Sequence, residues 1–265
     1  MRFYNPHTSP PEKVESTALF PKSSLEEGCA RCLDLELLPS VTSVLGTVRQ
    51  EFVERWRMGE AIKNFSKHGN ARMAIIQHYA TDSKESLFGT RVHETIHQFT
   101  QGIPIEDEEA YAHALPLVDW LQKNECQTLL SEETLACSKS GTAGTIDLVL
   151  RDKNGKKILG DVKVVKVSNR FEKIPPLTYR CQLSAYERML LEIDPEPMQK
   201  MSFYLASPFG DLTTPQLTIF RYSEDYYPEF QACLALWHAQ YGKKNEKPQR
   251  EDHNPHVSFD PFTHK

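Results

Sequence analysis

The pair Asn154-Gly155 constrains the fold more than any other feature, because it separates two runs that have the composition of β-strands. These runs are Gly144–Arg151 and Lys157–Val167. Asn-Gly between two such runs is typical of the tight turn of a β-hairpin, which needs positive φ angles that Asn and Gly adopt readily. The sequence therefore predicts an antiparallel pair of strands at this point.

Three charged side chains belong to this predicted hairpin. Alternate residues of a strand share a face, so Asp161 and Lys163 project from the same side, about 7 Å apart along the backbone. The turn can bring Asp147 beside Asp161. Two carboxylates and an ammonium among apolar strand residues are costly to bury, and a divalent cation such as Mg²⁺ would compensate that cost. An Asp/Lys pair on a strand is also typical of a surface ion pair, so the spacing alone leaves both interpretations open.

The rest of the chain has helical and strand periodicities in turn. Helical spacing begins after Pro39 and continues, with breaks near Gly69 and Asn70, to about Tyr79. Further helices are expected at Ser86–Thr100 (ended by Gly102), Glu106–Asn124, Tyr179–Glu192 and Glu224–Tyr241, and further strands at Leu129–Ala136, Met201–Ala206 and Leu217–Tyr222. We therefore expect an α/β fold with a central mixed sheet of four or five strands flanked by helices, and with an N-terminal helical segment.

Composition changes along the chain suggest three parts. Residues 1–38 contain four prolines and little periodicity, which predicts an extended, poorly ordered arm. Residues 39–242 form one predicted domain, with a helical part at 39–125 and a catalytic core at 126–242. Residues 243–265 are polar and contain three prolines, which predicts a flexible tail.

Bulk properties limit the class of protein. The chain of 265 residues has a net charge of −5 and lacks both an apolar run long enough to span a membrane and a secretory signal, so we expect a cytoplasmic protein with no membrane partner. Residues 151–180 nevertheless hold nine basic and three acidic residues, which suits either a solvated hairpin or a phosphate-binding patch. Cys29 and Cys32 form a CxxC without a second half, which favours ordinary reduced cysteines over a zinc site.

Five motifs follow one another in an order that resembles a known group of enzymes. They are Pro39–Leu45 with Trp56 and Gly59-Glu60, Gly89–His93, Gly144–Asp147, Asp161–Lys163, and Gln182–Tyr186. Together they resemble the motifs of RecB-type nucleases of the PD-(D/E)xK superfamily. The leading segment is similar to that of the mitochondrial genome-maintenance exonuclease and related phage exonucleases. Two positions depart from the family pattern, because Val162 and Val164 stand where an aromatic and a hydroxyl residue are common.

The resemblance implies a function and a setting. It implies a restriction-endonuclease-like core and a metal-dependent DNA nuclease that hydrolyses phosphodiester bonds with Mg²⁺, or with Mn²⁺ as a substitute. An exonuclease acting on single-stranded DNA ends is favoured, in DNA repair or recombination within a bacterial or phage-infected cell. Relatives with an iron–sulfur cluster carry three cysteines after the Gln/Tyr helix, whereas only Cys233 follows here, so no cluster is expected. Protein partners are not indicated.

The resemblance also assigns roles to residues. His93, Asp147 and Asp161 would bind the metal, and Lys163 would serve the attacking water. Glu132 or Glu133 is a candidate for a further acid. Residues expected to line the site or contact nucleic acid are Gln182, Tyr186, Thr145, Lys166, Arg170 and Arg180, with Phe88, Phe171 and Tyr179 as candidate stacking aromatics.

Two alternatives come from other classes of protein. His93-Glu94-Thr-Ile-His97 is a literal HExxH, the helical signature of zinc metalloproteases. That interpretation leaves Asp147, Asp161 and Lys163 without a role. The other alternative is a catalytically inactive DNA-binding module on the same fold, against which the intact set of candidate catalytic residues argues.

Overall fold

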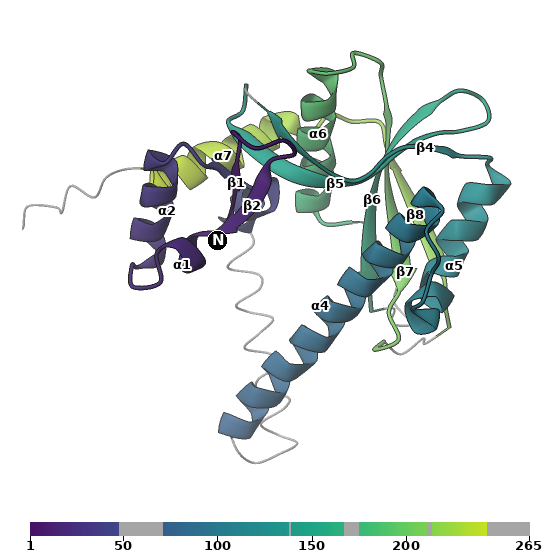
Figure 1. Cartoon of the computed structure of the whole chain (residues 1–265), viewed down its shortest axis with the longest axis horizontal. Coiled ribbons are helices and arrows are strands. Elements are labelled where there is room, and N and C mark those ends of the chain that lie inside the picture. Colours follow the sequence, from purple (N-terminus) through teal and green to yellow (C-terminus); the bar gives the residue numbers. More distant parts are fainter. Residues whose placement is uncertain (48–70, 138, 167–174, 211–213, 243–265) are drawn as a thin grey trace, which may run out of the picture.

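A five-stranded mixed sheet flanked by helices forms the centre of the molecule (Figure 1). The computed structural model describes residues 1–47, 71–137, 139–166, 175–210 and 214–242, with the backbone alone described over 71–83. The sheet has the order β4-β5-β6-β7-β8. Its strands are β4 (Gln127–Cys137), β5 (Thr142–Arg151), β6 (Lys157–Val165), β7 (Gln199–Ala206) and β8 (Leu217–Tyr222). The predicted α/β class and the predicted mixed sheet are confirmed.

The predicted hairpin joins β5 and β6. The two strands are antiparallel, and Arg151 pairs with Lys157 next to the turn. Gly155 has φ of +79°, and Asp152 Oδ1 accepts hydrogen bonds from the backbone N–H groups of Asn154 and Lys156 at 2.9 and 2.8 Å. The carboxylate thus organises the turn that the Asn-Gly pair makes accessible.

A single crossover makes the sheet mixed. Strand β6 runs parallel to β7, and helix α6 (Leu177–Leu191) connects them, whereas every other neighbouring pair of strands is antiparallel. Parallel neighbours need such a crossover because the chain has to return to the same end of the sheet. The crossover places Gln182 and Tyr186 against the sheet, where both side chains are buried.

Helices α4 (Ala71–Gln101) and α5 (Glu108–Lys123) cover one face of the sheet. The predicted interruption between Tyr79 and Ser86 is wrong, because α4 is continuous there. The segment between them is polar but contains neither Gly nor Pro, so nothing in it breaks a helix. Helix α4 ends before Gly102, whose φ is +69°, as the sequence predicts.

An ion pair fixes α4 against the start of α5. Asp107 caps α5 by accepting a hydrogen bond from the Ala110 N–H at 3.0 Å. The same carboxylate accepts two hydrogen bonds from the Arg91 guanidinium, at 2.6 and 2.7 Å. The paired geometry orients both helices and thereby holds the middle of α4 over the sheet.

The first 38 residues are folded, which corrects the prediction of an extended, poorly ordered arm. They form β1 (Arg2–Asn5), β2 (Glu12–Glu15), α1 (Ser16–Leu19), α2 (Leu25–Asp34) and the start of β3 (Leu38–Pro39). The strands pair as a small sheet of order β2-β1-β3. Phe3 is fully buried against Trp237 of helix α7 (Tyr227–Tyr241), with ring centroids 5.9 Å apart. The prediction relied on proline content and weak periodicity, and the strands are too short to give a clear periodicity.

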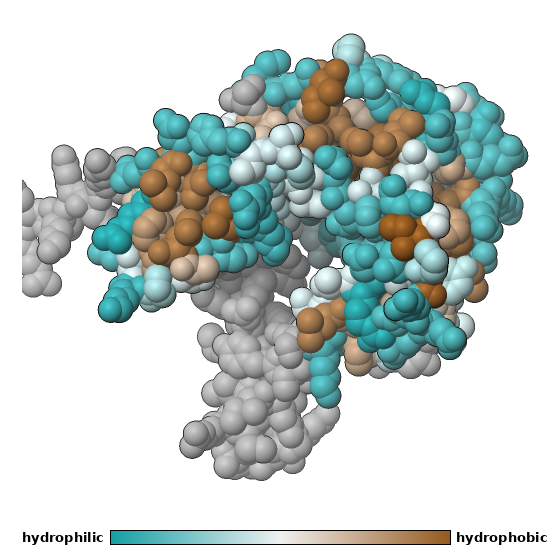
Figure 2. Space-filling model, viewed as in Figure 1, coloured by the Kyte–Doolittle hydropathy of each residue, from teal (hydrophilic) through white to brown (hydrophobic). Residues whose placement is uncertain are grey.

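The sheet has a hydrophobic core on each face, one under α4 and α5 and one under α6. The N-terminal elements belong to the core on the α6 face. Cys29 and Cys32 are buried there as free cysteines, together with Phe3 and Trp237. Hydrophilic residues cover much of the molecular face shown in Figure 2, and apolar residues gather over α1 and α2, where Leu19, Leu25 and Leu35 are exposed. The predicted tail at 243–265 and the motif residues Trp56, Gly59 and Glu60 lie outside the described residues.

Within the described parts of the chain, no helix combines the length and the apolar character needed to cross a bilayer.

Candidate metal centre

The candidate site lies where β5 separates from β6. The two strands pair from Arg151 and Lys157 as far as Leu148 and Gly160. Beyond this point the Val162 N–H donates a hydrogen bond to the Asp147 side chain, at 2.7 Å from Oδ2, instead of to a backbone carbonyl. The carboxylate therefore satisfies a backbone group at the opening of the ladder and is held in one orientation by it.

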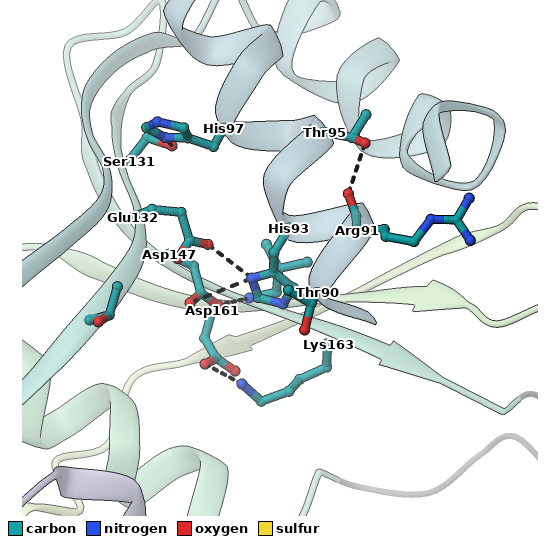
Figure 3. Close-up of polar contacts among 12 residues, drawn as sticks. Thr90, Arg91, His93, Thr95, His97, Ser131, Glu132, Asp147, Asp161 and Lys163 are labelled. Carbon is teal, nitrogen blue, oxygen red and sulfur yellow. Dashed lines mark hydrogen bonds and ion pairs between the residues drawn. The ribbon is translucent and has the colours of Figure 1, made fainter. Parts of the chain in front are cut away.

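Three side chains from three elements converge at this opening (Figure 3). His93 comes from α4, Glu132 from β4 and Asp147 from β5. His93 Nδ1 lies 3.0 Å from Glu132 Oε1 and 3.8 Å from Asp147 Oδ1, and the three ligand atoms all lie within 4.8 Å of one another. One ring nitrogen and two carboxylates at this spacing form a set that can hold a divalent cation.

A backbone irregularity directs Glu132 into this group. Its φ is +51°, a left-handed conformation that non-glycine residues seldom adopt. In a regular strand Ser131 and Glu132 would point to opposite faces, but Ser131 Oγ contacts His97 and Glu132 contacts His93, both on α4. The sequence left Glu132 and Glu133 as alternatives, and this local conformation selects Glu132.

Asp161 and Lys163 form a pair beside the group. Lys163 Nζ donates a hydrogen bond to Asp161 Oδ1 at 2.5 Å, and the Asp161 side chain is 1% exposed. The other oxygen, Asp161 Oδ2, is buried without a hydrogen-bond partner among the described residues. Burial and the nearby Asp147 carboxylate raise the pKa of Asp161, although Lys163 acts in the opposite direction. An unsatisfied carboxylate oxygen in this position would gain from a cationic ligand.

Carboxylates dominate the electrostatics of the site. Burial alone would lower the pKa of His93, but the charges of Asp147 and Glu132 outweigh it and raise that pKa to about 9. Burial likewise opposes the charge on Lys163, yet Asp161 and Asp147 raise its pKa. Both shifts show that the site stabilises positive charge strongly.

The residues therefore fit the Mg²⁺ that the motifs imply. The carboxylates of Glu132, Asp147 and Asp161 supply hard oxygen atoms, and the free Oδ2 of Asp161 is an available ligand. The imidazole of His93 is a ligand that Mn²⁺ accepts as well. The predicted set of His93, Asp147 and Asp161 is thus arranged differently from expectation, because Glu132 lies in the group and Asp161 pairs with Lys163.

A cavity of about 240 Å³ opens beside Asp147 and Glu132. Gln182 and Tyr186 line it, in agreement with the prediction for α6. The Tyr186 ring lies against the backbone of β5, since a Cβ on Gly144 would come within 2.6 Å of Tyr186 Cε1. Gly144 is therefore required for this close approach, which explains its place in the motif before Asp147.

The residues predicted to contact nucleic acid are distributed differently. Thr145 lines the cavity, and its hydroxyl lies 3.0 Å from that of Thr134. Lys166 forms an ion pair with Glu85, and Arg180 donates a hydrogen bond to Tyr226 Oη at 3.0 Å, so neither lines this cavity. Arg170 lies outside the described residues.

The basic stretch at 151–180 is partly neutralised by partners elsewhere in the chain. Arg151 pairs with Glu196 at 2.7 Å, and Lys157 pairs with Asp194. The count of charged residues over 151–180 did not include Asp194 and Glu196, because both lie outside that stretch. The stretch is therefore a weaker candidate for phosphate binding than its composition suggests.

The candidate stacking aromatics have three different outcomes. Phe88 is 2% exposed in the core between α4 and the sheet, so that expectation is corrected. Tyr179 lies beside the site, with Lys163 Nζ 5.2 Å from its ring centroid. Phe171 lies outside the described residues.

The HExxH residues do not act as one group. His93 faces Asp147, whereas His97 Nδ1 lies 3.0 Å from Ser131 Oγ. Glu94 is exposed and accepts a hydrogen bond from Gln98 at 3.2 Å. Within the described chain, the group able to hold a metal contains His93 but neither Glu94 nor His97.

Three cavity residues come from the N-terminal sheet and were not predicted. They are Arg2, Tyr4 and Lys13. Tyr4 is 2% exposed, and its hydroxyl lies 3.2 Å from that of Thr145. The sequence carries no clear signal for this strand, because it is four residues long and its two buried residues, Phe3 and Tyr4, are consecutive.

Comparisons with known proteins add little to this geometry. No family model and no curated protein matches the chain. Among solved structures, the chain is similar to the one described as "Crystal structure of SSO0001", with 14% sequence identity, a TM-score of 0.33, and coverage of 70% of this chain and 71% of that chain. A TM-score of this size carries no argument about fold or function.

Proposed function

We propose that this protein is a Mg²⁺-dependent DNA nuclease of the PD-(D/E)xK superfamily, with a restriction-endonuclease-like core. The observation that carries the proposal is the meeting of His93, Glu132 and Asp147 next to the ion pair of buried Asp161 with half-buried Lys163. Carboxylates that hold a divalent cation beside a lysine are suited to phosphodiester hydrolysis. The order of the motifs resembles that group, and the β5–β6 hairpin followed by α6 supports the same assignment.

The residues of the candidate site have separate roles in the proposed reaction. His93, Glu132, Asp147 and Asp161 would hold the ion, which when bound stabilises charge on the phosphate and makes a bound water more acidic. The raised pKa of Lys163 keeps its ammonium protonated, so it donates hydrogen bonds to the attacking water or to a phosphate oxygen. Burial raises the pKa of Tyr186 well above its usual value, so its hydroxyl also remains a donor.

The walled cavity favours single-stranded DNA ends. It lies beside Glu132 and Asp147 and is bounded by the N-terminal sheet as well as by the central one. The cavity, of about 240 Å³, is bounded on two sides, which supports entry of one strand in preference to a duplex. Together with the resemblance of the leading segment to exonucleases, this access supports the proposal of exonuclease action on a strand end.

The test uses purified protein with end-labelled single-stranded and double-stranded DNA, in Mg²⁺, Mn²⁺, Zn²⁺ or EDTA. We expect degradation that requires Mg²⁺ or Mn²⁺ and is lost in Lys163→Ala. Lys153→Ala is the matched control, because Lys153 is exposed on the hairpin turn. The sizes of the products distinguish exonuclease from endonuclease action.

Other outcomes would contradict the proposal in different ways. Binding of DNA without cleavage under any condition would favour an inactive DNA-binding module. Zn²⁺-dependent digestion of casein that is lost in Glu94→Ala would instead identify a metalloprotease.

A further inference from the structure

One wall of the cavity carries positive charge and is built by the N-terminal sheet. In β1, Arg2 and Tyr4 project from the face opposite to Phe3, because alternate residues share a face. In the neighbouring strand β2, Lys13 pairs directly with Tyr4. Since Phe3 is buried in the core, the face that carries Arg2, Tyr4 and Lys13 is the one turned toward the cavity.

Tyr4 fixes this wall against the central sheet. Its side chain is buried, and its hydroxyl lies 3.2 Å from Thr145 Oγ1, which itself lies 3.0 Å from Thr134 Oγ1. The contact joins β1 to β5, two residues before Asp147. The N-terminal sheet is therefore held at a defined position relative to the candidate metal centre.

The two basic side chains on the wall remain accessible. Arg2 is 44% exposed and lies 3.6 Å from Glu15, which shares its face of the sheet. Lys13 is exposed and has no ion pair among the described residues. Two cations and one anion leave the wall with net positive charge, opposite the carboxylates of Glu132 and Asp147.

We propose that Arg2 and Lys13 bind the phosphate of the substrate strand next to the scissile one, and so make this cavity specific for a single strand. The inference rests on the proposed nuclease function. A phosphodiester chain needs cations along its length, and the cavity offers a metal-binding wall for one phosphate and a basic wall for its neighbour. The exposed hydroxyl of Thr42 lines the same cavity and would supply a hydrogen bond to a phosphate oxygen.

The experiment compares the wild-type protein with Arg2→Gln/Lys13→Gln. Cleavage of a single-stranded oligonucleotide in Mg²⁺ should show a KM raised by about tenfold, with kcat changed by less than about twofold, because only strand binding is lost. Binding of a fluorescent strand in EDTA should become less dependent on salt, with the slope of log K against log salt shallower by about 0.7 for one lost phosphate contact.

Two controls distinguish phosphate binding from a general effect on the fold. Lys22→Gln removes an exposed charge from the same N-terminal segment and should leave both KM and the salt slope unchanged. Arg2→Lys/Lys13→Arg restores the charges and should restore KM. A substrate with one neutral methylphosphonate linkage beside the scissile bond should bring the KM values of the wild-type and doubly substituted proteins together.

The outcomes separate this inference from the proposed function. If the wild-type protein cleaves the strand and Arg2→Gln/Lys13→Gln behaves like Lys22→Gln, the nuclease stands and the basic wall is refuted. If the wild-type protein cleaves no strand but binds strands with a steeper salt slope than Arg2→Gln/Lys13→Gln, the nuclease fails while the basic wall stands as a phosphate-binding surface. If the wild-type protein binds no strand at all, both are wrong.

Discussion

The two walls of the cavity differ in charge, in position along the chain and in the way they are held. The acidic wall consists of Glu132 and Asp147 with His93, and its side chains are fixed by mutual contacts inside the central core. The basic wall consists of Arg2 and Lys13 on a small sheet whose buried face packs on α7. The difference means that the proposed chemistry and the proposed strand binding depend on different elements, so we expect that each can be disturbed while the other is retained.

The largest expected effect is on the acidic wall alone. Asp147→Asn removes a charge from the candidate ligand group but keeps an oxygen that can accept the Val162 N–H. We expect cleavage to fall by about 10³-fold, because loss of metal-dependent charge stabilisation is worth several kcal/mol. Initial rates in Mg²⁺ and thermal melting check this prediction, with Asp119→Asn on the exposed side of α5 as control. An active Asp147→Asn protein would remove the acidic wall from the reaction.

A smaller effect tests which glutamate belongs to the acidic wall. Glu132→Gln loses the charge next to His93, and we expect metal affinity and cleavage to fall by about 10–100-fold. Glu133→Gln changes the adjacent residue identically and should stay within about twofold of wild type. Titration of Mn²⁺ by calorimetry and cleavage rates provide the comparison. Equal effects in both variants would show that the left-handed conformation of Glu132 has no role in ligand choice.

Gly144 tests the contact between the acidic wall and α6. A Cβ in Gly144→Ala would meet the Tyr186 ring at 2.6 Å, so the ring or the strand has to move, at a cost of about 1–3 kcal/mol in the free energy of unfolding. Gly160→Ala is the matched variant, because its Cβ would meet Phe203 at 2.7 Å on the other core. We expect both variants to unfold at a lower temperature than the wild-type protein. Only Gly144→Ala should also reduce the cleavage rate per molecule of folded protein.

The smallest expected effect lies outside both walls. Asp107→Asn weakens the cap of α5 and the contact with Arg91, which we expect to cost about 1 kcal/mol of stability and to leave KM unchanged. Hydrogen bonds from Arg91 and Ala110 lower the pKa of Asp107 to about 2, so its contribution is present above the unfolded value near 3.8 and is lost as the pH falls toward 2. Urea unfolding at pH 6 and pH 3 should show the difference between the two proteins shrinking at the lower pH.

Local patterns predicted the parts of the site that lie on the central sheet. The Asn154-Gly155 turn sets the register of β5 and β6, and that register brings Asp147 to Asp161 and Lys163. Helical spacing then suffices to place Gln182 and Tyr186 on one side of α6. The hairpin and the helix face depend on residues close in sequence, so the spacing of residue types along the chain is enough to predict them.

Contacts between distant segments could not be predicted in the same way. The choice of Glu132 depends on one backbone angle, and the pairing of Lys166 with Glu85 depends on how β6 meets α4. The N-terminal sheet was missed because its strands are two to four residues long, too short for a clear alternation, and because prolines surround them. Its place in the fold is set by tertiary packing on α7.

The contact between Phe3 and Trp237 also has a consequence for the order of folding. Closing a loop between residues so far apart is entropically costly, so we expect the hairpin of β5 and β6 to form early and β1 to dock late. At a synthesis rate of about 5–20 residues per second, β1 waits on the order of 10–50 s before α7 has been made. A ribosome-bound chain therefore lacks the basic wall until α7 emerges, and strand capture would switch on only with the finished protein.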